Sequence, residues 1–151
     1  MKSIAIVLLA ASAALAADPP SFALWTGASA RQMEKDLTAR LKNGLASQPL
    51  GNMGNYTFGM TLRTQSGTAE IHEKMADIFV IESGEAIVAT GGKLVDSRTS
   101  APGEIRGTSV DGGEEHHVTA GDVLTIPAGM PHQMRVVPGQ QVLYLAIKVA
   151  Q

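Results

Sequence analysis

The stretch of sequence that decides the fold is residues 121–132, which read GDVLTIPAGMPH. Gly121-Asp122 is typical of a turn, and Val123–Ile126 is a short apolar β-strand candidate. Proline fixes φ and glycine tolerates positive φ, so Pro127-Ala128-Gly129 predicts a second tight turn. His132 then opens a returning strand. The segment therefore predicts a rigid hairpin that directs one imidazole toward the interior of a β-structure.

The chain around this hairpin has the period of two that is typical of half-buried strands. Tyr56, Phe58, Met60 and Leu62 alternate with smaller or more polar residues. Later strand candidates are separated by turn glycines, and no helical pattern recurs between them, which disfavours a parallel βαβ architecture. These candidates are 69–73, 78–81, 85–89, 116–119, 123–126, 131–136 and 142–149. An all-β sandwich or jelly-roll barrel is the architecture that such short, evenly spaced strands favour.

The segment 121–132 resembles the second motif of the cupins, a family of small jelly-roll barrels. That motif reads Gly, five residues, Pro, one residue, Gly, two residues, His, three residues, Asn. Gly121, Pro127, Gly129 and His132 stand at this spacing, and Val136 replaces the final Asn. In the family this histidine is a metal ligand. The resemblance therefore implies a single cupin jelly-roll barrel over residues 56–151, with His132 as a metal ligand.

The first cupin motif has a degraded counterpart here. The family places two His two residues apart, then Glu after three or four residues, then Gly after six more. Asp77 precedes Gly84 by that spacing, and counting back four residues puts His72 at the second histidine and Glu70 at the first. A second register makes Lys74 the second histidine position but leaves only two residues before Asp77. We prefer the first register, because Glu can hold a metal whereas Lys would place a cation at the ion's position.

The predicted metal site therefore consists of Glu70, His72, Asp77 and His132. Residues two apart on a strand point to the same side, so Glu70 and His72 share a face. Two imidazoles with carboxylates are ligands for divalent Fe, Mn, Ni, Co or Zn. The chain contains no cysteine, which excludes thiolate ligands.

A metal-free barrel is the alternative, in which His132 bonds to backbone and Asp77 pairs with Lys74 or Arg63. His116 and His117 follow two glutamates, and we interpret them as a partly exposed strand end, with one of them as a ligand only in a minority interpretation.

The N-terminus has the three parts of a secretory signal peptide. Lys2 precedes the small apolar run Ile4–Ala17, which contains the cleavage triplet Ala14-Leu15-Ala16. The run is shorter than the roughly 20 residues that a membrane span requires. We expect residues 1–16 to be removed after Ala16 and the protein to be exported, to a periplasm or as a secreted protein.

Residues 17–55 are expected to form an N-terminal extension with one amphipathic helix at about 29–43. Ser29 and Gln32 form a capping-box pattern, an apolar residue recurs every four positions from Met33, and Asn43-Gly44 supplies a stop. Residues 96–115 are polar and rich in Gly, Ser and Thr. They predict a mobile loop or lid, interrupted at most by a short pairing segment near 104–106.

Composition removes several function classes. With 12 Lys and Arg against 14 Asp and Glu, the chain has no basic excess for nucleic acid. Serines lack a neighbouring His/Asp pattern, so serine-hydrolase chemistry has no support. Three function classes stay open. The first is a metal-dependent dioxygenase or isomerase, in which Glu73 or Lys74 serves as acid, base or substrate anchor. The second is a binding protein for a small molecule or metal, and the third is a barrel whose metal site is empty. The interpretation we adopt is an exported cupin with a divalent-metal site in a small-molecule pocket, its reaction unspecified; the resemblance also implies a homodimer.

Overall fold

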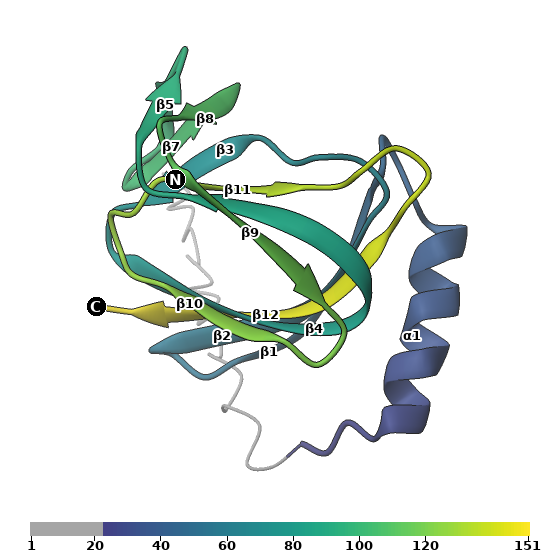
Figure 1. Cartoon of the computed structure of the whole chain (residues 1–151). Coiled ribbons are helices and arrows are strands. Elements are labelled where there is room, and N and C mark those ends of the chain that lie inside the picture. Colours follow the sequence, from purple (N-terminus) through teal and green to yellow (C-terminus); the bar gives the residue numbers. More distant parts are fainter. Residues whose placement is uncertain (1–22) are drawn as a thin grey trace, which may run out of the picture.

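A computed structural model describes residues 23–151 (Figure 1). The predicted signal peptide, residues 1–16, lies outside the described residues. One helix is followed by twelve strands. They are α1 (Gly27–Ala39), β1 (Leu45–Asn52), β2 (Tyr56–Arg63), β3 (Ala69–His72), β4 (Met75–Thr90), β5 (Lys93–Val95), β6 (Arg98–Ala101), β7 (Glu104–Gly107), β8 (Ser109–Asp111), β9 (Glu114–Thr119), β10 (Val123–Ile126), β11 (His132–Arg135) and β12 (Val142–Ala150). The predicted all-β barrel with one N-terminal helix is confirmed.

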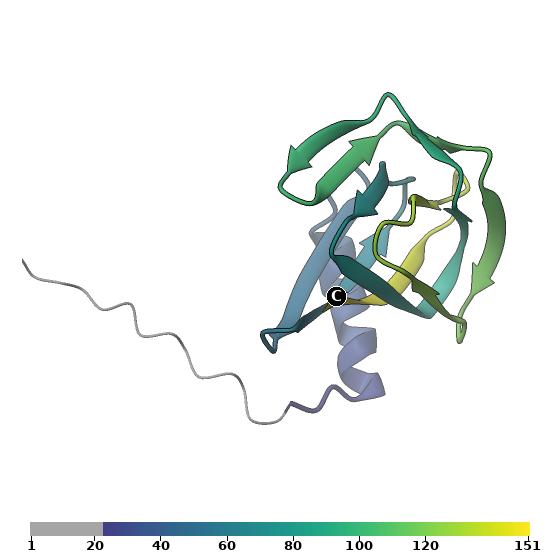
Figure 2. The same ribbon diagram turned by 90° about the vertical axis from the view of Figure 1, so that its left-hand side faces the viewer.

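The barrel is one curled sheet that turns around its long strand β4. The strand order is β1-β2-β12-β4-β11-β3-β7-β6, with β9 and β10 also paired to β4. The first half of β4 pairs with β12 and β10, and its second half pairs with β9 and β11. These pairings form two layers, and β4 belongs to both. The turned view in Figure 2 shows the curl of the sheet, with the strands of the polar segment at its upper rim.

The continuity of β4 differs from the sequence prediction, which placed two strands at 78–81 and 85–89. The chain instead bends without leaving the sheet, because Gly84 adopts a φ of +75° and the register to β12 shifts near it. A Cβ at Gly84 would lie 2.0 Å from the carbonyl oxygen of Gln141. Glycine therefore acts here as a bend within a strand rather than as a turn between two strands.

Two apolar layers form because side chains alternate along β12. Val142 and Tyr144 point into the barrel, where they pack with residues such as Phe79, Ile81 and Val88. Leu143 points outward and packs beneath α1. The helix contributes Met33 and Leu37 to this outer layer, as its sequence pattern predicted. Figure 1 shows α1 lying along the outside of the sheet.

The helix begins and ends earlier than predicted. Thr26, not Ser29, is the N-cap, and its hydroxyl accepts a hydrogen bond from the Ser29 backbone N–H. Asn43 and Gly44, the expected stop, adopt positive φ and connect the region after the helix to β1. Strand β1 lies in the segment assigned to the extension and pairs with β2, so that segment adds an edge strand to the sheet. No helix within residues 23–151 is long and apolar enough to cross a membrane.

The polar segment 96–115 is not the expected long loop. It contains β6, β7, β8 and the start of β9, and β7 pairs with β3 along its whole length. Backbone pairing thus occurs although most side chains of the segment are polar: the residues of β6 are exposed, whereas those of β7 are partly buried and Gly107 is buried.

We expect Leu37→Ala to lower the free energy of unfolding by about 3 kcal/mol, because it leaves a cavity between α1 and the sheet. The Leu37 side chain is fully buried. Leu24→Ala is the matched control, since Leu24 is 71% exposed and should change stability by less than about 0.5 kcal/mol. Urea unfolding followed by circular dichroism measures both, and equal stabilities would contradict the packing described for α1.

Candidate metal centre

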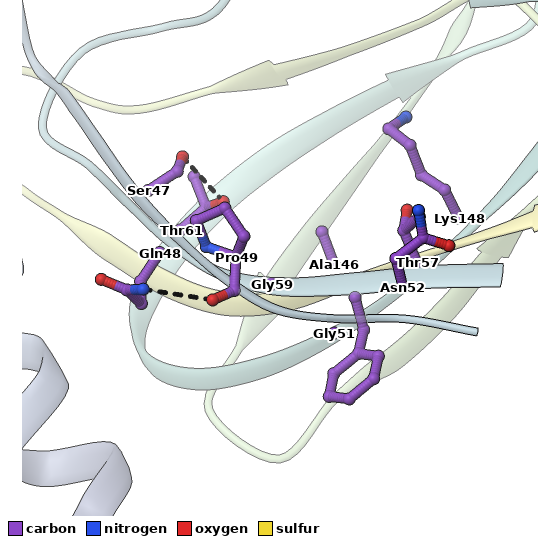
Figure 3. A pocket seen from close by; sticks show the side chains of 11 residues that line it. Ser47, Gln48, Pro49, Gly51, Asn52, Thr57, Gly59, Thr61, Ala146 and Lys148 are labelled. Atoms are coloured by element: carbon purple, nitrogen blue, oxygen red, sulfur yellow. Dashed lines mark hydrogen bonds between the residues drawn. The ribbon is translucent and has the colours of Figure 1, made fainter. Parts of the chain in front are cut away.

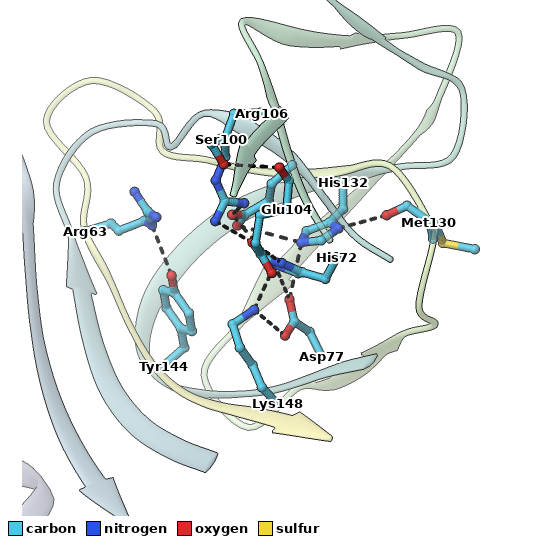
Figure 4. A network of polar contacts seen from close by, with 11 residues as sticks. Arg63, His72, Asp77, Ser100, Glu104, Arg106, Met130, His132, Tyr144 and Lys148 are labelled. Atoms are coloured by element: carbon cyan, nitrogen blue, oxygen red, sulfur yellow. Dashed lines mark hydrogen bonds and ion pairs between the residues drawn. The ribbon is translucent and has the colours of Figure 1, made fainter. Parts of the chain in front are cut away.

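Strand register brings the predicted site residues together. Glu70 and His72 lie on β3, and His132 is the direct cross-strand partner of Glu70 on β11. Asp77 lies near the start of β4, on the other layer of the barrel. The side chains of His72, Asp77 and His132 are almost completely buried, at 2%, 1% and 3% exposure. All four predicted residues therefore meet at one point inside the barrel. Figure 4 shows His72, Asp77 and His132 at this point.

The ligand atoms of these residues face a common centre. Asp77 Oδ2 lies 3.3 Å from Nε2 of His72 and 3.3 Å from Nε2 of His132. Carboxylate oxygens of Glu70 lie 3.7 Å from the same two nitrogens. Two ligands that each stand about 2.1 Å from one tetrahedral ion are about 3.4 Å apart. The separations between Glu70, His72 and His132 are compatible with a shared metal ion, and these three residues form a group that could hold one.

Hydrogen bonds outside the centre fix the tautomers of the two imidazoles. His72 Nδ1 lies 2.7 Å from a carboxylate oxygen of Glu104, and His132 Nδ1 lies 3.0 Å from the carbonyl oxygen of Met130. Both oxygens only accept, so each Nδ1 carries the donated proton and each Nε2 presents its lone pair to the centre. The tight turn is also tied to β3, because the Gly129 N–H donates to the His72 carbonyl at 2.8 Å. This is the outer hydrogen bonding that metal-binding histidines require.

Two atoms at the centre have no hydrogen-bond partner. They are His132 Nε2 and Asp77 Oδ2, both fully buried. Leaving such atoms unsatisfied is costly, and acceptors that face one another need a cation or a donor between them. Glu70, His72 and His132 each offer a ligand atom, and these atoms lie within 4.8 Å of one another. The donor set present therefore fits a divalent transition metal.

Lys148 also reaches this centre, which the sequence analysis did not foresee. It is the cross-strand partner of Asp77 on β12. Its Nζ donates to Asp77 Oδ1 at 2.7 Å and to His72 Nε2 at 2.8 Å. Asp77 thus pairs with Lys148 rather than with Lys74 or Arg63, and Arg63 donates to the Tyr144 hydroxyl instead. The signal in the sequence was the two-residue spacing from Tyr144 and Ala146, which places Lys148 on the interior face.

Strand β7 supplies two further residues that sequence reasoning missed. Glu104 lies opposite His72, and Arg106 lies opposite Glu70, in the β3–β7 register. The Arg106 guanidinium donates to both Glu104 and Glu70. The polar segment that was expected to be a lid therefore holds the outer side of the centre. Its only sequence signal was the short pairing segment near 104–106.

Other polar candidates lie outside the centre. His116 and His117 are exposed on β9, where they contact Thr90 and Glu85. Glu73 and Lys74 are exposed in the turn between β3 and β4. The interpretation of the histidine pair as an exposed strand end agrees with this placement.

Charges around the centre shift two pKa values in opposite directions. Burial by itself would raise the pKa of Asp77, but the imidazoles of His132 and His72, each 3.3 Å away, and the Lys148 charge hold it well below its usual range. Burial lowers the pKa of His72, yet the nearby Asp77 carboxylate and the hydrogen bond to Glu104 outweigh burial and the Lys148 charge, so that the pKa is raised. Asp77 is consequently a carboxylate at neutral pH, and acid favours a proton on His72.

A cavity of about 570 Å³ adjoins the centre on the interior face of β1, β2 and β12 (Figure 3). Lys148 is one of its lining residues, beside the hydroxyls of Ser47, Thr57 and Thr61. The same lysine therefore contacts both the centre and the cavity. The volume is in the range of small-molecule sites, about 300–1,000 Å³.

Comparisons with known proteins agree with this architecture. Residues 106–151 match the family described as the AraC-like ligand binding domain. A comparison with curated protein sequences gave no match. Among solved structures, a protein described as a predicted oxalate decarboxylase from Thermotoga maritima is 16% identical, with a TM-score of 0.53 over 71% of this chain and 81% of that one. A cupin superfamily protein from Desulfitobacterium hafniense is 16% identical, with a TM-score of 0.51 over 74% and 82%.

A recombinant oxalate oxidase in complex with glycolate is 20% identical, with a TM-score of 0.51 over 73% of this chain. The match spans 53% of the oxalate oxidase, so this chain corresponds to about half of that protein. The fold shared by these structures is the cupin fold, and the resemblance stated from the sequence is confirmed at that level.

We expect Asp77→Asn to reduce the sensitivity of the fold to acid. A carboxyl whose folded pKa is depressed stabilises the protein fully above its unfolded pKa, about 3.9, and loses that contribution as pH falls toward the folded pKa. In the wild type, the free energy of unfolding should therefore drop steeply below about pH 4, and this drop should be smaller in Asp77→Asn. Urea unfolding at pH 7, 5, 4 and 3 measures it. Exposed Asp111→Asn is the control, and an identical acid response in all three proteins would contradict the ion pairing described.

Proposed function

We propose that the protein is an exported cupin-fold protein that binds one divalent transition metal and a small molecule beside it. Glu70, His72 and His132 would hold the metal, and Asp77 would supply a further carboxylate oxygen. The observation that carries this proposal is the convergence of lone pairs on one buried point, where His132 Nε2 and Asp77 Oδ2 have no partner. Fe, Mn, Ni, Co and Zn all accept such a set of nitrogen and oxygen ligands.

The chain's own residues prepare the site for that role. Glu104 and the Met130 carbonyl hold both imidazoles in the tautomer that directs the Nε2 lone pair toward the centre. Arg106 keeps the Glu70 carboxylate in place. A metal held by these residues would supply a Lewis acid. A dioxygenase or isomerase reaction on a small organic substrate is one use of such a site, and reversible ligand binding is another.

A metal-free binding barrel is the second candidate, and one observation favours it. The ammonium of Lys148 already donates to His72 and Asp77 in the position of a cation. In that case the adjoining cavity binds its ligand without a metal, and Lys148 takes the place of the metal ion at the centre.

Metal analysis distinguishes these candidates. We expect protein purified without chelators, or reconstituted with Mn²⁺, Co²⁺ or Zn²⁺, to contain close to one metal ion per chain by inductively coupled plasma mass spectrometry. His132→Ala should reduce metal uptake by at least about tenfold, as removal of a direct ligand does. His117→Ala, an exposed histidine outside the centre, is the matched control and should load normally. If the wild-type protein takes up no transition metal on reconstitution, the metal-site proposal is contradicted and the metal-free binding barrel is supported.

Export is a separate part of the proposal and rests on the N-terminal pattern alone. Expression of the full chain in a Gram-negative host should yield protein in the periplasm or medium whose first residue, by N-terminal sequencing or intact mass, is Ala17. Replacing Ala14 and Ala16 with larger residues should block processing, because signal peptidases require small residues at those positions. Unprocessed protein in the cytosol of the wild-type expression would contradict export and leave the metal proposal unaffected.

A further inference from the structure

Lys148 makes a hydrogen bond at the centre that a bound metal would have to replace. His72 Nε2 has one lone pair, and Lys148 Nζ donates to it at 2.8 Å. A metal that binds His72 must use that same lone pair. Lys148 and a metal therefore cannot both be bonded to His72, and two cations this close also repel each other.

The structure offers the lysine a second position. Its side chain is 36% exposed and forms part of the wall of the adjoining cavity. Four flexible carbons carry the ammonium, so Nζ can turn toward that cavity while the backbone stays in β12. Lys148 lies opposite Thr57 in the β2–β12 register, on the same face as Thr61.

The cavity contains no other charged residue among those that line it. An ammonium that turned into it would lose its carboxylate partner Asp77 and find only hydroxyl and amide groups, such as those of Ser47 and Thr57. A cation in a lining that has no carboxylate is electrostatically complementary to an anionic ligand. A small organic anion therefore complements the cavity only when Lys148 has left Asp77.

We propose that Lys148 is a built-in cation that occupies the metal position in the metal-free protein, turns into the adjoining cavity when a divalent metal binds, and there binds a small organic anion. This inference rests on the proposed metal function and adds to it the charge of the ligand. It makes metal loading and anion binding mutually dependent, since each favours the same position of one side chain.

The first test compares the zinc affinity of the wild type and Lys148→Met by competition with a chromophoric chelator. The variant should bind Zn²⁺ at least tenfold more tightly, because no ammonium has to be displaced. Exposed Lys93→Met removes the same charge outside the centre and should match the wild type. Equal affinities of the wild type and Lys148→Met overturn the inference, whereas failure of every protein to bind zinc contradicts the proposed metal function instead.

Loss of Lys148 also leaves Asp77 without its ion-pair partner in the metal-free state. Zinc should therefore raise the melting temperature of Lys148→Met by more than it raises that of the wild type. Should Lys148→Met fail to fold, Lys148→Gln takes its place in both measurements, because the amide retains a donor toward Asp77 without the charge. An equal zinc-induced shift in the variant and the wild type counts against displacement.

The second test uses benzoate as the anion and isothermal titration calorimetry. Zinc-loaded wild-type protein should bind benzoate at least tenfold more tightly than the metal-free protein. In zinc-loaded Lys148→Met this gain should disappear. Equal benzoate affinity of the two zinc-loaded proteins overturns the anion role of Lys148, since the metal alone then accounts for binding.

Discussion

The ion pair between Asp77 and Lys148 is the interaction on which the interior of this barrel depends. Asp77 is 1% exposed, and an ionised carboxylate at such a depth is tolerated only when a cation and hydrogen bonds compensate for lost hydration. Lys148 supplies the charge from the adjacent strand at 2.7 Å. Both imidazoles face the other oxygen of the same carboxylate. The position of this one carboxyl group thus determines the electrostatics of the centre.

Around that pair, the site is built in two shells with different roles. The inner atoms are acceptors that converge, and the outer groups on β7 and in the turn before β11 hold them in that orientation. The outer shell includes a glutamate and an arginine from a segment whose composition is that of a loop. Polar sequence does not prevent strand formation when the backbone can pair with a neighbour, as β7 does with β3. The polar side chains Glu104 and Arg106 of this segment hold His72 and Glu70 in place at the centre.

The sequence predicted the parts of the molecule that local patterns control. The turn before His132, the alternation along β2 and the buried face of α1 all follow from spacing, and the structure has each of them. The predicted hairpin ending at His132 is wrong, because β10 pairs with β4 in one layer whereas β11 pairs with β3 and β4 in the other. Cupin-type spacing also selected the four residues that meet at the centre. Prediction failed where long-range pairing decides the outcome: Gly84 bends a continuous strand, and Leu45–Asn52 becomes an edge strand because β2 is beside it. Lys148 was missed for the same reason, since only the β4–β12 register places it opposite Asp77.

Strand β4 belongs to both layers, and this affects how the protein unfolds. Its first half is bonded to β10 and β12 and its second half to β9 and β11, so neither layer retains all its neighbours if the other unfolds. The two layers should accordingly unfold in a single cooperative transition instead of as separate units. Asp77 and Lys148 come from one layer, and Glu70, His72 and His132 from the other. A ligand bound between the two layers would stabilise both of them. Its binding would therefore add in full to the free energy of global unfolding.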